Sequence, residues 1–230
     1  MRYLVWDFDG TLAERTGQWS GALVKVLRRE KPDSSATADN FRPHLQSGFP
    51  WHTPDIPCAG ARTSDEWWNC LSPVFERAFR LGAGLSHADS NRLAAMVRSE
   101  YVDPSSWRLF ADTLPALRDL SAEGWSHIVL SNHVPELDDI LHALGLKSHV
   151  EAVFNSARTG FEKPHPEAFR QVLRAVSEGA RCVMVGDSLA ADIKGAYSVG
   201  WPAILVRKRH PEAGLCCESL LQLSQTLKGV

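Results

Sequence analysis

Four short apolar runs constrain the fold of this chain more than any other feature of its sequence. They are residues 3–6, 127–130, 182–185 and 203–206, and residues 152–154 form a weaker run. Runs rich in Val, Ile and Leu, without alternating polar residues, are typical of strands buried on both faces. Apolar residues at helical spacing lie between them, and Gly124, Gly145 and Gly179 are the expected helix ends. Because helices and strands alternate, we predict an α/β protein with a parallel sheet and right-handed crossovers.

The stretch between the first run and about residue 105 interrupts this alternation. It contains several prolines, its recognisable runs at residues 21–29, 66–81 and 87–100 are helical, and it shows no good strand. A connection of about 90 residues without a strand is far longer than an ordinary loop. We therefore predict an inserted helical domain at residues 15–104, with a core domain formed by residues 1–14 and 105–230.

Polar residues gather where the predicted strands end. In an open parallel sheet, ligands bind at the carboxyl ends of the strands, so these side chains are expected to lie together. They are Asp7, Asp9 and Thr11 after the first strand, Ser131 and Asn132 at the end of the second, Lys163 in a loop, and Asp187 and Asp192 after the third.

The carboxylates of this set require a counter-charge. Asp7 and Asp9 are two residues apart, so in an extended segment they point the same way. If Asp187 joins them, like charges about 4 Å apart repel by roughly 4 kcal/mol at an effective dielectric constant of 20. A divalent cation removes this repulsion, and an all-oxygen set of ligands favours Mg²⁺ over zinc.

Two other interpretations of the polar set are less consistent with the sequence. A purely structural cluster would require four strand ends to gather polar residues that no ligand uses. A receiver domain also places acidic residues, a hydroxyl and a lysine around Mg²⁺, but its phosphorylated aspartate ends a middle strand and its lysine comes late. Here the acidic pair comes first and another acidic segment comes last. The order of a receiver domain is therefore not met.

Four motifs occur in the order typical of the haloacid dehalogenase superfamily, which this chain closely resembles. They are DFDGT at 7–11, the strand ending in Ser131, Lys163 within FEKPHPEAF, and GDSLAAD at 186–192. The resemblance implies a Rossmann-like parallel sheet core with an inserted helical cap domain, of the type that follows the first motif. Within the insertion, SDEWW at 64–68 resembles a eukaryotic group of this superfamily.

The resemblance also implies a chemical role for the acidic residues. Asp7 would be the nucleophile and form an aspartyl-phosphate. Asp9 would protonate the leaving alkoxide and then activate water. Mg²⁺ would be bound by Asp7, by the backbone carbonyl of Asp9 and by Asp187. Asp192 would hydrogen-bond beside these ligands, for instance to Lys163.

The remaining motif residues would bind the phosphoryl group. Ser131 and Lys163 would contact its oxygens, and backbone N–H groups near Asn132 would add donors, because the phosphoryl group in transfer spreads charge over three oxygens. Thr11 would support this loop or the phosphate site. Ser131 and Asn132 could also cap the following helix.

Asp9 decides between the reactions of the superfamily. Members that cleave carbon–halogen bonds lack an acid two residues after the nucleophile and work without Mg²⁺. We therefore predict hydrolysis of a phosphorylated small metabolite. Transfer to a second hydroxyl by a phosphomutase, dehalogenation, and a silent binding protein on the same fold are the alternatives.

Substrate choice is expected to depend on the inserted domain, because the core contacts only the phosphate. Arg15 and Trp19, just after the first motif, are the predicted substrate contacts. Trp67 and Trp68 point about 100° apart on a helix, so they cannot both face one core. Either one of them faces the active-site cleft, or both pack inside the inserted domain.

Composition limits the remaining classes. The formal net charge of −2 gives no electrostatic reason to expect nucleic acid as a partner. No apolar run approaches the roughly 18 residues that span a bilayer, and the N-terminus does not resemble a signal peptide. Five cysteines at irregular spacing do not suggest disulfides or, with His44 and His52, a zinc site. We expect a soluble cytoplasmic protein, and its oligomeric state stays open.

Overall fold

The computed structural model describes residues 1–56 and 63–230 and divides the chain into two compact units. The first unit contains Met1–Glu14 and Arg108–Val230, together with a short stretch that begins at Pro54. The second contains Arg15–Thr53 and the described part of Ala59–Trp107. Residues 57–62, which fall within the predicted inserted domain, lie outside the described residues.

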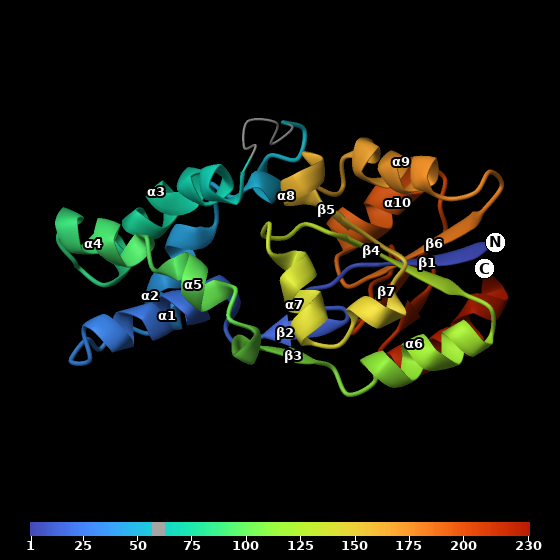
Figure 1. Cartoon of the computed structure of the whole chain (residues 1–230), viewed down its shortest axis with the longest axis horizontal. Helices are drawn as coiled ribbons and strands as arrows, with labels where there is room; N and C mark the ends of the chain where they lie inside the picture. The colour runs from blue at the N-terminus through green and yellow to red at the C-terminus, as the bar shows by residue number, and fades with distance from the viewer. Residues whose placement is uncertain (57–62) are drawn as a thin grey trace. The chain divides into compact units, whose positions relative to one another are not determined.

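A six-stranded sheet forms the centre of the first unit, and every neighbouring pair of its strands is parallel. The strand order β5-β4-β1-β6-β7-β8 places the N-terminal strand in the interior of the sheet, as Figure 1 shows. This confirms the predicted α/β class and parallel sheet. The strands are β1 (Arg2–Trp6), β4 (Ser126–Ser131), β5 (Ala152–Asn155), β6 (Arg181–Gly186), β7 (Ala203–Val206) and β8 (Cys216–Cys217).

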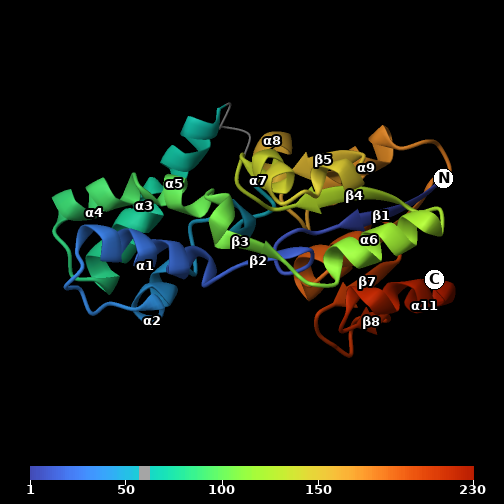
Figure 2. The same cartoon turned by 60° about the horizontal axis from the view of Figure 1, so that its bottom comes forward.

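Helices cover both faces of this sheet. Helices α9 and α10 lie on one side and α6 on the other in Figure 1, and Figure 2 shows α9 and α6 again from a second direction. The helical segments of the unit are α6 (Thr113–Ala122), α7 (Leu137–Ala143), η4 (Lys147–His149), α8 (Ser156–Thr159), α9 (Pro166–Ala175), the π-helical turn η5 (Leu189–Lys194), α10 (Gly195–Ser198), η6 (Leu220–Gln222), α11 (Leu223–Thr226) and η7 (Leu227–Gly229).

The two faces of β1 belong to different halves of the core. Tyr3 and Val5 pack in a cluster with Phe169 of α9. On the opposite face, the indole of Trp6 donates to His127 Nδ1 at 3.0 Å. Because successive side chains of a strand alternate, one short apolar run supplies both layers.

The second unit is helical. Helix α3 packs against α4, and α1 packs against α2 and α5. Its elements are α1 (Gln18–Glu30), α2 (Ala38–Phe41), η1 (Arg42–Leu45), η2 (Pro50–His52), α3 (Ser64–Gly82), α4 (His87–Ala94), α5 (Val97–Tyr101) and η3 (Pro104–Ser106).

Stacked aromatic rings hold the interior of the second unit. The ring of Trp19 lies 3.7 Å from that of Tyr101 and nearly parallel to it, and 5.4 Å from the ring of Phe75. Such rings bury large apolar areas and gain further from their relative geometry. The predicted helical insertion therefore has an aromatic core of its own.

Several elements differ from the predicted ones. The helix predicted at 87–100 is interrupted between α4 and α5. The prediction of no strand in the stretch before residue 105 was wrong at its edge: β2 (Ala13–Arg15) pairs with β3 (Trp107–Leu109), where the chain passes between the units. Strand β8 was also missed. Strands of two or three residues are too short to leave a recognisable pattern.

No helix in the described part of the chain is both long and apolar enough to cross a bilayer.

The contact between α9 and α10 predicts a measurable stability difference. Phe169 is fully buried, its ring is edge-on to that of Trp201, and a side chain at Gly195 would come within 2.6 Å of it. Phe169→Ala is expected to lower the free energy of unfolding by about 3–5 kcal/mol in urea titrations. Leu173→Ala, on the exposed side of the same helix, is the control and is expected to change it little. Equal losses in the two variants would contradict this packing.

Candidate active site

Parallel pairing of β1 with β4 and β6 places three predicted residues at one edge of the sheet. Asp7 follows β1 and continues the ladder, because its N–H donates to Val185 O at 3.0 Å. Ser131 is the last residue of β4, and Asp187 directly follows β6. The Ser131 hydroxyl donates to Asp7 Oδ1 at 2.9 Å. The spacing of the strands therefore brings together side chains that are far apart in sequence.

A buried lysine connects this edge to the loop before α9. Lys163 Nζ donates to Asp7 Oδ1 at 2.9 Å and to Asp192 Oδ1 at 2.6 Å, and the side chain is 2% exposed. Burial alone would lower the pKa of Lys163, but the charges of Asp192 and Asp7 outweigh it and raise that pKa. The ammonium is therefore charged at every physiological pH. The predicted contact between Asp192 and Lys163 is present.

Asn132 fixes the backbone beneath this lysine. Its side-chain Oδ1 accepts from the Lys163 N–H at 2.7 Å, and its Nδ2 donates to the Lys163 carbonyl at 2.8 Å. One amide side chain thus satisfies both backbone groups of one residue. Phosphate binding by backbone N–H groups near Asn132 stays a prediction, and the Asn132 side chain positions Lys163.

Asp192 is held on its other side by the turn after β6. Its Oδ2 accepts from the Ser188 N–H at 2.9 Å, and the Ser188 hydroxyl accepts from Ala191 N at 3.1 Å at the start of η5. A Cβ at Gly186 would lie only 2.2 Å from the Asp192 carboxylate. Glycine at 186 is therefore required by this close approach.

The loop after Asp7 turns sharply. The carbonyl of Phe8 accepts from the N–H groups of Thr11, Leu12 and Ala13, and Gly10 has φ +83°. A Cβ at Gly10 would lie 2.9 Å from the Asp187 carboxylate. The positive φ and this contact both favour glycine at position 10.

Thr11 and Asp9 occupy different positions in this loop. Thr11 is fully buried, and its hydroxyl makes no hydrogen bond to any residue that the structure describes. The Asp9 side chain is half-buried and is not one of the clustered carboxylates described next.

Three carboxylates form a cluster suited to a divalent cation. Asp7, Asp187 and Asp192 each offer an oxygen, and these three atoms all lie within 4.8 Å of one another. Burial, and then the nearby charge of Asp7, raise the pKa of Asp187. Because Asp192 already binds Lys163 and Ser188, Asp7 and Asp187 are the carboxylates that fit a cation. An oxygen-only set suits Mg²⁺ or Ca²⁺.

An arginine that the sequence analysis did not single out holds the loop that follows Asp7. The Arg207 guanidinium donates to the Thr11 carbonyl at 2.7 Å and pairs with Asp112 at 2.8 Å. It also lies 4.0 Å from the ring centre of Phe110. No local pattern reveals this residue, because its partners lie almost 100 and 200 positions away.

Two buried titratable groups beside the site were also not foreseen as functional. His133 packs edge-on against Phe8, and burial lowers its pKa to about 4, so the ring is neutral. Glu162 is 1% exposed, and neither carboxyl oxygen makes a hydrogen bond in the described part of the chain. Burial raises the pKa of Glu162 to about 7, although Ser156 and Lys163 partly oppose the shift.

The two predicted substrate contacts lie in the second unit. The Arg15 guanidinium is buried and pairs with the Glu100 carboxylate at 3.0 Å, and it also donates to the Gln18 carbonyl at 2.9 Å. Trp19 stacks on Tyr101. The structure therefore places both residues in the aromatic core of that unit, and substrate contact by either stays a prediction.

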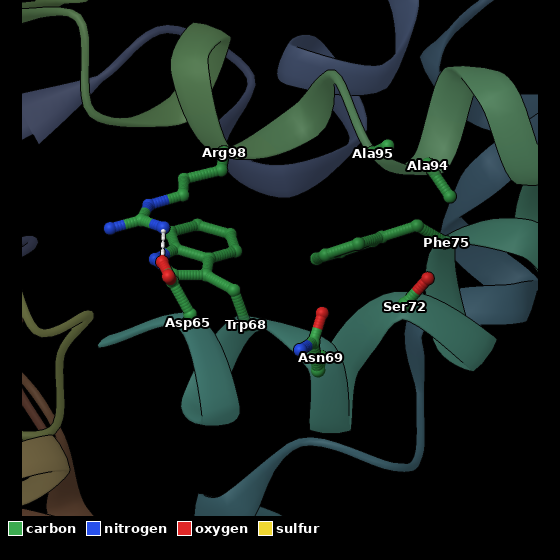
Figure 3. Close-up of a pocket in the computed structure, with 8 residues that line it drawn as sticks. All are labelled: Asp65, Trp68, Asn69, Ser72, Phe75, Ala94, Ala95 and Arg98. Carbon is green, nitrogen blue, oxygen red and sulfur yellow. Dashed lines mark hydrogen bonds and ion pairs between the residues drawn. The ribbon is translucent and has the colours of Figure 1, made fainter. Parts of the chain in front are cut away.

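Trp67 and Trp68 are both buried, and Trp68 borders a pocket. This pocket has a volume of about 320 Å³ and lies within the second unit, between α3 and the α4–α5 segment (Figure 3). Figure 3 shows the ion pair of Arg98 with Asp65 at one end of this pocket. Its lining residues are Asp65, Trp68, Asn69, Ser72, Phe75, Ala94, Ala95 and Arg98.

Four of the five cysteines lie in the described part of the chain. Cys70, Cys182, Cys216 and Cys217 are free thiols, and Cys58 lies outside the described residues. Across residues 1–56 and 63–230, the carboxylate cluster is the one group of potential metal ligands found.

The Glu162 carboxyl predicts a pH-dependent stability difference. Its pKa is raised from an ordinary 4.5 to about 7, so the folded state holds a proton that the unfolded state has lost between these values. This costs stability progressively as the pH rises from 4.5 to 7, to a total of about 3 kcal/mol above pH 7. Glu162→Gln is therefore expected to gain stability relative to the wild type across this range.

Urea titrations at pH 5 and pH 8 give the free energy of unfolding of the variant and of the wild type. The variant's advantage is expected to be larger at pH 8 than at pH 5. Exposed Glu178→Gln is the control and is expected to show no such change. A Glu162→Gln difference that is the same at both pH values would contradict the raised pKa.

Comparisons with known proteins agree with this geometry. The family described as haloacid dehalogenase-like hydrolase matches residues 1–200. Haloacid dehalogenase-like hydrolase domain-containing protein 3 of Mus musculus is 32% identical over 214 residues, which cover 92% of this chain and 84% of that protein. The SDEWW resemblance pointed to the group of this protein.

Two further proteins share parts of this similarity. The ribulose-1,5-bisphosphate 5-phosphatase of Halopiger xanaduensis is 34% identical over 57% of this chain and 55% of its own length. The structure of the magnesium-bound HAD-hydrolase YfnB of Bacillus subtilis superposes with a TM-score of 0.75 and 22% identity, over 99% of this chain and 98% of that one. The second likeness concerns the fold.

The family match runs from β1 to α10, so it includes the loops that carry Asp7, Ser131, Lys163 and Asp187, and it ends before β7. The predicted family and the prediction of a hydrolase are thus confirmed: this chain belongs to the haloacid dehalogenase-like hydrolases.

Proposed function

We propose that this protein is a Mg²⁺-dependent phosphatase that hydrolyses a phosphorylated small metabolite through an aspartyl-phosphate on Asp7. The observation that carries this proposal is the convergence of Lys163 and Ser131 on one oxygen of Asp7. Two donors on one oxygen of the Asp7 carboxylate set the orientation of its second oxygen. The same two donors are suited to phosphoryl oxygens. The similarity to a named phosphatase supports the same reaction class.

Asp7 is suited to nucleophilic attack. It lies beside the charged ammonium of Lys163, and its carboxylate is held by contacts from β4 and from the loop before α9. A phosphoryl group in line with this carboxylate would place its oxygens near the Lys163 ammonium and the Ser131 hydroxyl. These donors would stabilise the charge that spreads over the phosphoryl oxygens during transfer.

Asp9 is assigned the proton transfers. It lies in the same tight turn as Asp7, two residues on, and it is more accessible than Asp7. It would protonate the ester oxygen as the alcohol leaves and would then take a proton from the water that attacks the aspartyl-phosphate. A carboxylic acid at this position serves a leaving alkoxide, whereas a leaving halide needs no proton.

The oxygen cluster of Asp7 and Asp187 would hold the metal, with the Asp9 carbonyl as a third protein ligand. When bound, Mg²⁺ would neutralise the carboxylates and draw charge from the transferring group. Asp192 is assigned a positioning role, because its contacts go to Lys163 and Ser188. Thr11 is assigned to support of the loop.

The second unit is assigned the role of a cap that selects the substrate, with residues 1–14 and 105–230 as the catalytic core. Two observations support a separate role for it: it has an aromatic interior of its own, and it contains a pocket. Arg15 and Trp19 remain predictions as substrate contacts. The substrate class implied is soluble, so a cytoplasmic site of action is part of the proposal.

Asp7→Asn provides the direct test of the nucleophile. The amide keeps the size of the carboxylate but cannot attack phosphorus, so kcat with 4-nitrophenyl phosphate and Mg²⁺ is expected to fall at least 10³-fold. Circular dichroism of the variant is expected to match the wild type. Two results would contradict the mechanism. One is a wild type that stays active after chelation of Mg²⁺, and the other is an Asp7→Asn variant as active as the wild type.

Asp9→Asn separates the two chemical steps. With 4-nitrophenyl phosphate the leaving group needs little protonation, so the first step proceeds while water activation fails. Rapid-mixing measurements are expected to show a burst of about one 4-nitrophenolate per protein, followed by slow turnover. With an alkyl phosphate the burst is expected to disappear, because the first step then needs the acid. If turnover of both esters falls by the same factor and neither shows a burst, the role of Asp9 is contradicted.

A further inference from the structure

The segment after β7 carries three consecutive cationic side chains at the edge of the sheet where Asp7 lies. Arg207 uses its guanidinium for the Thr11 carbonyl and Asp112, and Arg209 pairs with Glu218 at 3.0 Å. Lys208 lies between them and extends to Asp187 Oδ2 at 3.5 Å. In the part of the chain that the structure describes, the Asp187 carboxylate is its one charged partner.

The backbone that directs Lys208 is held in an unusual conformation. Arg207 has φ +67°, in the left-handed region that residues with a side chain rarely adopt. Its contacts with Thr11, Asp112 and Phe110 hold it there. Residues kept in such regions by surrounding contacts cluster at functional sites. The anchor at Arg207 therefore fixes the starting point of the Lys208 side chain beside Asp187.

Lys208 differs from Lys163 in exposure and in reach. Lys163 is 2% exposed, whereas the Lys208 side chain is 53% exposed, and its ion pair is long enough to be loose. A divalent cation on Asp187 would repel the ammonium of Lys208. Metal binding would therefore release Lys208 from Asp187 and leave its ammonium beside the site.

The strand order sets the distance between Asp7, where the phosphoryl group would bind, and Lys208. Asp7 follows β1 and Lys208 follows β7, with β6 between them. Two strand spacings amount to about 10 Å, and the Lys208 ammonium bridges part of this distance to reach Asp187 rather than Asp7. An anion bound by Lys208 would therefore lie several ångström to the side of the phosphoryl group on Asp7. That separation matches two acid groups on one small molecule.

Resting on the proposed phosphatase function, we propose that Lys208 selects phosphate monoesters that carry a second anionic group. The second group is a carboxylate or a second phosphate, which share the anionic oxygens that an ammonium binds. Lys208 is thus a substrate-specificity residue of the site, supplied by the first unit.

Matched pairs of esters test this specificity. For the carboxylate, 2-phosphoglycolate is compared with 2-hydroxyethyl phosphate, and for the second phosphate, 1,3-propanediol bisphosphate is compared with the monophosphate. The wild type is expected to show a higher kcat/KM for the doubly acidic member of at least one pair. Lys208→Met is expected to reduce that preference about tenfold, and Lys208→Arg to retain most of it.

Lys194→Met is the matched control. Lys194 is also half-exposed and ion-paired in the first unit, at 2.8 Å from Glu212. Its loss is expected to leave the preference unchanged. A wild type without preference, or a Lys208→Met variant that loses the same factor for both members of each pair, would overturn the proposal. The second result would mean that Lys208 serves the transferring phosphoryl group.

Two binding measurements keep this test separate from the phosphatase proposal. If no ester is hydrolysed, the phosphatase proposal fails, and calorimetric affinities of the same four compounds for the wild type and Lys208→Met decide the role of Lys208. Mg²⁺ affinity without substrate is expected to be severalfold tighter in Lys208→Met, because the ammonium no longer competes for Asp187. An unchanged Mg²⁺ affinity would contradict the release of Lys208 by metal.

Discussion

The buried ion pairs of Lys163 with Asp7 and Asp192 are the interaction on which the rest of the site depends. A single buried ammonium without partners would be costly, as would a cluster of carboxylates without a cation. Each group is tolerated because the others are there. The Asn132 amide, the Ser188 N–H and Gly186 all serve the geometry of these pairs, since they hold the lysine backbone, one aspartate oxygen and the space for that aspartate.

The placement of the strand-end residues follows from local sequence and general sheet geometry. Buried runs that end in Asp7, Ser131 and Asp187 need only parallel pairing to meet at one edge. The Lys163–Asp192 contact was also foreseen, as a contact that the family resemblance implies. These positions could be predicted, although the chemistry assigned to them is a proposal that the experiments decide.

Other features depend on contacts that no sequence pattern contains. The role of the Asn132 side chain, which binds both backbone groups of Lys163, was not foreseen. Arg207 acts on Thr11 through a contact across the sheet edge, and Glu162 is buried by packing around a loop. Propensity and periodicity describe neighbours along the chain, so they cannot reveal which loops will close on one another.

The wide separation of the site residues in sequence has a consequence for how the protein acquires its site during folding. The Ser131–Asp7 bond closes a loop of 124 residues, and the Lys163–Asp7 bond one of 156 residues. Loop closure of this size is slow relative to local helix formation, and chains with such high contact order fold late at these points. The helices of the second unit lie between β1 and β4 in sequence, so they can form from local contacts while these strands are still unpaired. We therefore expect the edge of the sheet that carries Asp7, Ser131 and Lys163 to be completed late in folding.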